Sequence, residues 1–223
     1  MNTHPSSPIR LVLASSSPYR RELLAKLGIP FESASPDIDE TAMAGETPTQ
    51  LSKRLAEEKA HALRNHFPAH LIIGSDQVAI LDGVQLGKPG DTARAVAQLL
   101  AASGKAVEFF TSVCVMNSKT GMTVSDTDKT VVHFRTLSRR KIERYVDIER
   151  PFDCAGGFKS ESLGIALIER LETADPNALV GLPLIRLVGL LEKCGLEILG
   201  EKESLTQRRN DATTQRKSCN DDD

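Results

Sequence analysis

The sequence has no hydrophobic run long enough to cross a membrane. Its strictly apolar runs span only a few residues, and even the wider stretch Ala178–Ile185 is interrupted by Gly181 and Pro183, whereas a spanning helix needs about 18 apolar residues. Near the N-terminus only Leu11–Ala14 forms an apolar run, which is too short for the core of a secretory signal peptide. We therefore expect a cytoplasmic protein.

An excess of one charge is also missing. The chain has 28 basic and 30 acidic residues, for a net charge of −2. Such a balance gives no general attraction to nucleic acid or to an anionic membrane surface, which a basic excess would provide. We expect neither as a partner, and a polyanionic substrate would have to be held by a local cluster of cations.

The chain is poor in cysteine patterns that bind metal or form disulfides. Its four cysteines are far apart, none forms a C-x-x-C pair, and none of the five histidines lies near a cysteine at the spacing of zinc ligands. A chain of 223 residues buries enough surface on folding to need no disulfide or zinc staple. These features favour free thiols and no zinc site.

Three familiar catalytic loops are absent. Neither the G-x-G-x-x-G fingerprint of dinucleotide-binding folds nor the G-x-S-x-G elbow of serine hydrolases occurs. The segment Gly83–Pro89 resembles a Walker A loop, but it is one residue short and has Pro89 where Ser or Thr would bind magnesium. All three enzyme classes are therefore unsupported.

The composition that remains is that of a globular α/β protein. Hydrophobic residues make up 40% of the chain and charged residues 26%, which suits one domain over residues 9–200, or two lobes around a cleft. Residues 1–8 are expected to form a flexible leader. Residues 201–223 are expected to form a disordered tail, because they carry 11 charges and only three apolar side chains.

Helix signals alternate with strand signals along the body of the chain. Ser17 and Thr47 are capping residues followed by proline, and Asp91 and Ser138 can cap two further helices. Asp82-Gly83 between two apolar runs indicates a hairpin. We therefore predict an α/β fold with a mixed, twisted sheet and flanking helices. The expected helices are 18–27, 48–66, 93–102, 138–148 and 184–194, and the expected strands are 9–14, 31–34, 71–74, 78–81, 84–86, 107–116, 122–134 and 164–168.

One strand–turn–helix unit combines the features of an anion site. The hydroxyls of Ser15–Ser17 follow the first strand, and Arg20 and Arg21 lie in the first turn of the helix. A helix N-terminus binds anions through its free backbone N–H groups and its dipole, whereas cations placed there oppose that dipole. We favour a phosphate site for the cluster. Arg21 taken alone is better explained as a surface residue.

Lys59 interrupts the apolar stripe of the predicted helix 48–66. On a helical wheel it falls between Leu55 and Leu63, in the middle of that stripe. A lysine in such a place can extend its ammonium group out to solvent. We favour the alternative, that the stripe ends at a cleft and that Lys59 points into it.

Three carboxylates add to this candidate site. Asp76 lies where one apolar strand is expected to end and the next to begin, and ligands of open α/β sheets gather at the carboxyl ends of strands. Asp39 and Glu40 belong to an acidic loop. Such residues are often turn formers or solvated loop acids, but together with the cations they suit a magnesium–phosphate site, because magnesium prefers oxygen ligands and phosphates.

Seven short strings of this sequence resemble the Maf family of nucleoside triphosphate pyrophosphatases. Within that family, the strings SPYRR, GSDQ and CAGGFKSE are most similar to the branch that hydrolyses 7-methyl-GTP. The chain departs from that branch at Tyr19, where tryptophan is more common. The strings occur in the family's order over about residues 9–199 and comprise Leu13–Leu24, Asp37–Glu40, Arg54–Ala60, Ile73–Gln77, Gly87–Pro89, Cys154–Glu161 and Val180–Pro183.

The resemblance implies a two-lobed Maf/ITPase-like fold with a nucleotide in the cleft, a homodimer and a divalent metal cation, Mg²⁺ or Mn²⁺. It implies hydrolysis of a nucleoside triphosphate to the monophosphate and diphosphate. Asp76 matches the proton acceptor, and Glu40 and Asp76 match carboxylates associated with the metal. The matching phosphate-contacting positions are Ser15, Arg20, Lys59 and Lys88, and the positions matching base preference are Tyr19, Gln77 and Glu161.

Three functions stay open from the sequence. The branch resemblance favours 7-methyl-GTP as the substrate, in the removal of modified nucleotides. A pyrophosphatase for dTTP, UTP or other non-canonical nucleotides would share the catalytic residues and differ only at the three base positions. A nucleotide-binding regulator of cell division without turnover would not need Asp76, Lys59 and Lys88 together. Whether Asp76 acts as a base or as a metal ligand is also open.

Overall fold

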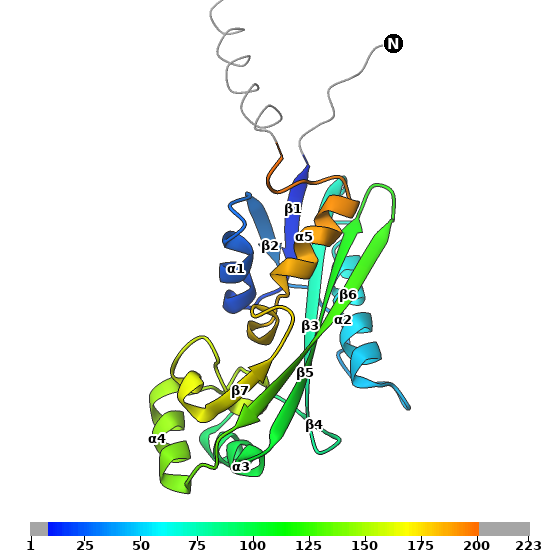
Figure 1. Ribbon diagram of the computed structural model, residues 1–223. Helices are drawn as coiled ribbons and strands as arrows, with labels where there is room; N and C mark the ends of the chain where they lie inside the picture. The colour runs from blue at the N-terminus through cyan, green and yellow to red at the C-terminus, as the bar shows by residue number, and fades with distance from the viewer. Residues whose placement is uncertain (1–8, 201–223) are drawn as a thin grey trace, which may run out of the picture.

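The computed structural model describes residues 9–200, so the predicted leader and tail lie outside the described residues. These residues form a seven-stranded mixed sheet of order β2-β1-β3-β5-β6-β7, with β4 paired to β3 (Figure 1). The predicted fold class is confirmed. The strands are β1 (Arg10–Ala14), β2 (Phe31–Ala34), β3 (His70–Leu81), β4 (Val84–Leu86), β5 (Ala106–Asn117), β6 (Thr123–Phe134) and β7 (Ile168–Glu172). The helices are α1 (Pro18–Ala25), α2 (Pro48–Ala62), α3 (Thr92–Ala102), α4 (Arg139–Glu149) and α5 (Leu184–Lys193), with 3₁₀ turns η1 (Ala155–Gly157), η2 (Leu163–Leu167) and η3 (Ala178–Val180).

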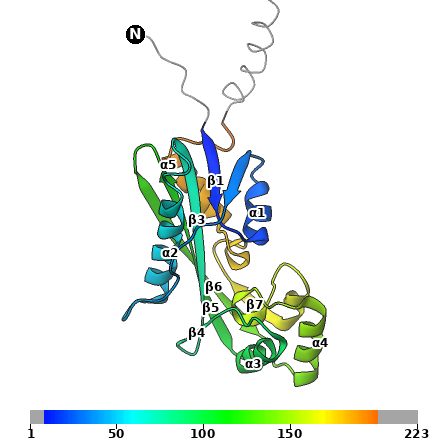
Figure 2. The same ribbon diagram turned by 180° about the vertical axis from the view of Figure 1, so that it is seen from behind.

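The sheet extends through two lobes (Figures 1 and 2). Strand β1 runs parallel to β2 and β3, and the remaining strand pairs are antiparallel. One lobe contains β1, β2 and the helices α1, α2 and α5, and the other contains α3, α4 and β7. The 12-residue strands β3, β5 and β6 pass from one lobe to the other, so the lobes share one continuous sheet.

The alternation of side chains along the strands assigns each helix to a face of the sheet. Leu11 and Leu13 of β1 pack in a core with α1 and α5, whereas Val12 and Ala14 pack against α2 on the opposite face. Successive residues of a strand point to opposite faces, so the apolar run of β1 is buried on both sides. The other lobe has its own core, in which Phe109 of β5 packs with α3 and α4.

Short-range polar contacts determine where the helices begin. The side chains of Ser17, Thr47, Asp91 and Ser138 each accept a backbone N–H from the first turn of the helix that follows, as predicted. The side-chain oxygen of Gln50 accepts the backbone N–H of Thr47, which completes the predicted capping box. The predicted hairpin is also confirmed, since β3 and β4 pair on either side of Asp82-Gly83. Helix α2 ends at Ala62 rather than at about residue 66, and turns follow it.

The predicted break between strands 71–74 and 78–81 is wrong. Strand β3 is continuous from His70 to Leu81, and its polar centre pairs with β5 throughout. Asp76 therefore lies in the middle of a strand, and not between two strands. The polar side chains of this segment do not interrupt the strand, because each finds a partner on α2, on β5 or in the segment around η3.

The predicted strand 164–168 is also wrong. Most of it forms the 3₁₀ turn η2, and strand β7 begins only at Ile168, where pairing with β6 begins. The carboxylate of Glu149 at the end of α4 accepts bonds from the Leu163 N–H and the Ser162 hydroxyl. These contacts come from another element and favour the turn over an extended chain.

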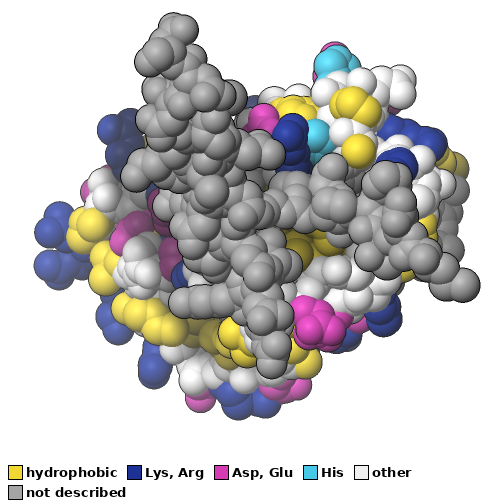
Figure 3. All heavy atoms as spheres, turned by 90° about the horizontal axis from the view of Figure 1, so that it is seen from above, with side chains coloured by type: hydrophobic (Ala, Val, Ile, Leu, Met, Phe, Trp, Pro, Cys, Tyr) yellow, Lys and Arg dark blue, Asp and Glu magenta, His cyan; other side chains and the backbone are white. Residues whose placement is uncertain are grey.

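The described surface has no large region of one charge in the view of Figure 3, where basic and acidic side chains are interspersed. Among residues 9–200, no helix combines the length and the apolar character needed to cross a membrane.

Candidate active site

An open pocket of about 530 Å³ lies between the two lobes. Its walls come from the turn between β1 and α1, the acidic loop, helix α2, the centre of β3, the loop after β4 and the segment around η1. The structure brings together all nine residues to which the family resemblance gives a role. They are Ser15, Tyr19, Arg20, Glu40, Lys59, Asp76, Gln77, Lys88 and Glu161.

A buried ion pair lies at the centre of the pocket. Asp76 and Lys59 are each only 7% exposed, and the Lys59 ammonium lies 2.6 Å from Oδ1 of Asp76 and 2.7 Å from Oε1 of Glu40. Lys59 therefore points into the pocket and joins the two carboxylates. This cation can hold Asp76 in one orientation while Oδ2 stays available, because no donor among residues 9–200 reaches that oxygen.

Gly74 explains how α2 approaches close enough to make this contact. A Cβ atom at this position would lie 2.0 Å from the carbonyl oxygen of Ala56 in α2. The missing side chain lets the helix backbone lie directly on β3. Asp76 projects from the same face of the strand two residues later, so Lys59, one turn beyond Ala56, reaches it.

Burial and neighbouring charges shift the ionisation of these groups in different directions. Burial raises the pKa of Asp76 above its ordinary value of 3.8, although Lys59 and Arg20 oppose the shift. For the more exposed Glu40, burial also acts to raise the pKa, but the cations Lys59, Lys88 and Arg20 together outweigh it and lower that pKa. Asp76 and Glu40 therefore differ in proton affinity.

The turn after β1 forms the cationic end of the pocket. Ser15 is buried and its hydroxyl accepts the N–H of Ser17, whose own side chain caps α1. Arg20 donates through Nε to the carbonyl of Gly181 at 2.8 Å, which leaves its terminal nitrogens for a ligand. Arg21 is exposed and is not part of the pocket wall.

The pocket wall around Tyr19, which precedes Arg20 at the start of α1, is suited to a planar ring. The Tyr19 hydroxyl lies 3.5 Å from Oδ1 of Asp153, and the Lys159 ammonium lies 5.9 Å from the centre of the Tyr19 ring. Burial, followed by the neighbouring Cys154 thiol and Asp153 carboxylate, raises the pKa of Tyr19, so its phenol stays neutral. Phe158 and Leu179 supply apolar wall.

Sequence reasoning assigned no role to Asp153, Phe158 and Leu179. Phe158 lies within the CAGGFKSE string, and Leu179 directly precedes the Val180–Pro183 string, so their positions could have been found from the family resemblance. The side-chain types of Phe158 and Leu179 give no signal in the sequence, because apolar residues lie far more often in a hydrophobic core than in a functional site.

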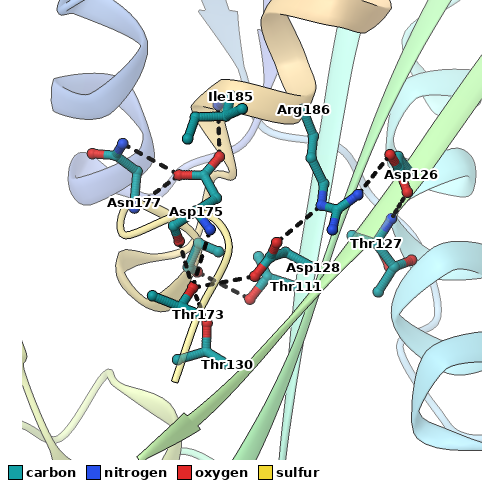
Figure 4. Close-up of polar contacts among 12 residues, drawn as sticks. Thr111, Asp126, Thr127, Asp128, Thr130, Thr173, Asp175, Asn177, Ile185 and Arg186 are labelled. Atoms are coloured by element: carbon teal, nitrogen blue, oxygen red, sulfur yellow. Dashed lines mark hydrogen bonds and ion pairs between the residues drawn. The ribbon is translucent and has the colours of Figure 1, made fainter. Parts of the chain in front are cut away.

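A polar network holds the chain segment that leads through η3 into α5 (Figure 4). Asp175, which is 1% exposed, accepts the backbone N–H groups of Asn177 and Ile185. Asp128, which is fully buried on β6, accepts from the Arg186 guanidinium and from the Thr173 hydroxyl. The two ends of the segment are therefore tied to each other and to the sheet.

The sequence of this chain is similar to that of one known protein family. The family model described as "Maf-like protein" matches residues 10–194. The chain belongs to the Maf family. A protein of Albidiferax ferrireducens named 7-methyl-GTP pyrophosphatase is 54% identical over 197 residues, which cover 87% of this chain and 99% of that protein.

Other relatives show the same relationship. A 7-methyl-GTP pyrophosphatase of Pseudomonas aeruginosa is 55% identical over 188 residues, covering 84% of this chain and 98% of that protein. Among solved structures, a HAM1 protein from Coxiella burnetii is partly alike, with a TM-score of 0.42 and 16% identity over 57% of this chain and 73% of its own. The predicted Maf family is thus confirmed on sequence.

The divalent metal that the Maf resemblance implies can be tested against the donors present. Glu40 and Asp76 converge on one cation, the Lys59 ammonium. Within residues 9–200, no three side chains of His, Cys, Asp or Glu gather into a metal site. Magnesium is commonly held by one or two carboxylates together with substrate phosphates, so this donor set fits a metal that arrives with the nucleotide.

Proposed function

We propose that this Maf protein hydrolyses 7-methyl-GTP to 7-methyl-GMP and diphosphate. The observation that carries the proposal is the buried Asp76–Lys59 pair between a cationic turn and an aromatic, acidic pocket end. Support also comes from relatives at about 54% identity that bear the name of this activity.

In the proposed reaction, Asp76 accepts a proton from the attacking water. The water oxygen bonds to the α-phosphorus, the bond from that phosphorus to the bridging oxygen of the β-phosphate breaks, and diphosphate leaves with the electron pair. A raised pKa makes Asp76 a better proton acceptor than an exposed aspartate, provided that it is ionised. Lys59 holds Oδ1 and leaves Oδ2 facing the water.

The cations of the pocket would offset the charge of the reacting group. Arg20, Lys59 and Lys88 line the same pocket, where they can stabilise negative charge on the triphosphate and on the departing diphosphate. Such electrostatic stabilisation is usually the largest contribution to catalysis. Glu40 and Asp76 are the residues that would hold a divalent cation, which when bound would polarise phosphate oxygens.

The wall around Tyr19 would read the base. Methylation at N7 makes guanine cationic, and an aromatic face attracts such a ring by about 0.5–2 kcal/mol beyond ordinary stacking. Tyr19 can provide that face, and the carboxylate of Glu161 can accept the N1–H and N2–H donors of the guanine edge. Tyr19→Ala should therefore lower the preference for 7-methyl-GTP over GTP, and Glu161→Ala should weaken guanine binding in general.

The test is diphosphate release from 7-methyl-GTP, GTP, UTP and dTTP, each with Mg²⁺ or Mn²⁺. We expect the highest kcat/KM for 7-methyl-GTP. A higher value for UTP or dTTP would overturn the base assignment and leave the pyrophosphatase reaction standing. Nucleotide binding with no diphosphate release from any of the four would instead favour a regulator without turnover.

A further inference from the structure

Gln77 has its hydrogen-bond donors already engaged within the protein. Its Nε2 donates to the Thr111 hydroxyl at 2.9 Å and to the carbonyl oxygens of Ala178 and Leu179 at 3.0 and 3.1 Å. The two carbonyls can only accept, so they determine which way the amide is turned. Its Oε1 has no protein donor among residues 9–200, and Gln77 lines the pocket. Gln77 can therefore offer the base an acceptor and no donor.

Two residues outside the proposed machinery hold Gln77 in this orientation. Thr111 is the register partner of Gln77 across β3 and β5, and its fully buried hydroxyl also donates to Ala178. Asp175 binds both ends of the turn that carries the two carbonyls (Figure 4). The turn is further held by Ser75, whose hydroxyl donates to the Gly181 carbonyl at 2.9 Å.

The orientation of Gln77 matters because the other proposed base reader also only accepts. An ionised Glu161 carboxylate has no donor, so the two side chains together present acceptors. Guanine matches this pattern, since its N1–H and N2–H donors are adjacent and its N2 amino group has a second N–H for the Gln77 acceptor. Adenine has an acceptor at N1, and uracil has a single N–H between two acceptors. An unpaired polar group at such an edge costs more than a good bond contributes.

We propose that Thr111 and Asp175 are positioning residues that keep Gln77 turned as an acceptor, so that the pocket selects bases with two adjacent N–H donors. This inference rests on the proposed function, because it names what that site selects. It identifies the substrate class by the donor edge alone, independently of the methyl group at N7.

The experiment compares GTP with inosine triphosphate, which lacks the N2 amino group. Wild-type protein should prefer GTP in kcat/KM by roughly tenfold or more, because inosine has no N2 amino group and leaves the Gln77 acceptor without a donor. Thr111→Val and Asp175→Asn should reduce that preference by roughly three- to tenfold, mainly through a higher KM for GTP. Thr111→Ser keeps the hydroxyl and should keep the preference.

Asp91→Asn is the matched control for Asp175→Asn. Asp91 also accepts a backbone N–H at a helix start, but it does not line the pocket, so the base preference should be unchanged. If Asp175→Asn fails to fold, the Thr111 pair decides. Equal losses of kcat/KM for GTP and inosine triphosphate, with the preference unchanged, would show a merely structural role and overturn the inference.

The outcomes separate this inference from the proposed function. A wild-type enzyme that releases diphosphate but does not discriminate between the two nucleotides overturns the inference and leaves the function standing. If no nucleotide is hydrolysed, the proposed function fails. Calorimetric affinities for GMP and IMP then still test the inference, which requires wild-type protein to favour GMP and Thr111→Val to lose that preference.

Discussion

Each of the four consecutive residues Gly74–Gln77 makes a different contact that the pocket needs. Gly74 and Asp76 face α2, where one allows close approach and the other meets Lys59. Ser75 and Gln77 face the opposite side and bond to the turn at η3. A strand alternates its faces, so these four consecutive residues connect the sheet to both walls of the pocket.

Asp76→Asn should separate activity from stability. The change keeps the shape and removes the proton acceptor, so turnover should fall by at least about 100-fold. In this variant the amide oxygen can still accept from the Lys59 ammonium, which also keeps its ion pair with Glu40, so Tm should change far less than turnover. Single-turnover diphosphate release and thermal unfolding measure the two effects. Near wild-type turnover in this variant would remove Asp76 from the mechanism.

The pH dependence of the reaction follows from the same shift. Asp76 must be ionised to accept a proton, and its raised pKa means that kcat/KM falls on the acid side above the ordinary value of 3.8. The contribution of Asp76 to the free energy of unfolding has the opposite pH dependence. It is present at low pH and is lost as the pH rises through the pKa of Asp76 in the folded state. A pH profile of kcat/KM in the wild type, with an acid limb at or below 3.8, would contradict the assignment.

At the scale of elements, the contact between α2 and β3 positions the central ion pair. Gly74→Ala places a Cβ 2.0 Å from the Ala56 carbonyl, so the helix must shift and move Lys59 away from Asp76. We expect a loss of about 1–3 kcal/mol in the free energy of unfolding, as overpacking commonly costs, together with reduced activity.

Gly189→Ala is the matched control for that change. Gly189 lies within α5, and nothing is within 4 Å of a Cβ at that position. Alanine there should stabilise the protein by about 0.5–1 kcal/mol, because glycine is unfavourable inside a helix. Denaturant unfolding of both variants checks the pair. Equal effects of the two substitutions would show that close approach at Gly74 is not what requires glycine.

At the scale of the whole molecule, the two lobes are not separate units of folding. Strands β3, β5 and β6 each contribute to both lobes, and β5 pairs with β6 from Ala106 to Met116. Breaking one lobe would therefore break strands that the other lobe needs. The pocket between the lobes lies on this shared sheet, which keeps its cationic and base-reading ends in register.

The shared sheet predicts a single cooperative unfolding transition for the described body. Calorimetry should give equal calorimetric and van't Hoff enthalpies, as for a two-state domain. Two resolved transitions would indicate lobes that unfold independently.

The expected homodimer and the cellular compartment stay predictions, and sedimentation measures the first of them.

The sequence alone determined the features that depend on near neighbours. Ser17, Thr47, Asp91 and Ser138 cap the helices that follow them, because a cap joins residues only three positions apart. The ordered strings likewise identified the Maf family and nine of the residues that line the pocket. Residue type and local spacing are enough for such predictions.

How those residues meet depends on contacts between distant segments of the folded chain. The continuity of β3 across Asp76 depends on its pairing with β5, and the orientation of Gln77 depends on Thr111 and Leu179, which are 34 and 102 positions away. Local propensity cannot report contacts over such separations. The local sequence of β3 predicts a break at its polar centre. The partners that stabilise this centre come from α2, β5 and η3, which only the folded chain brings to it.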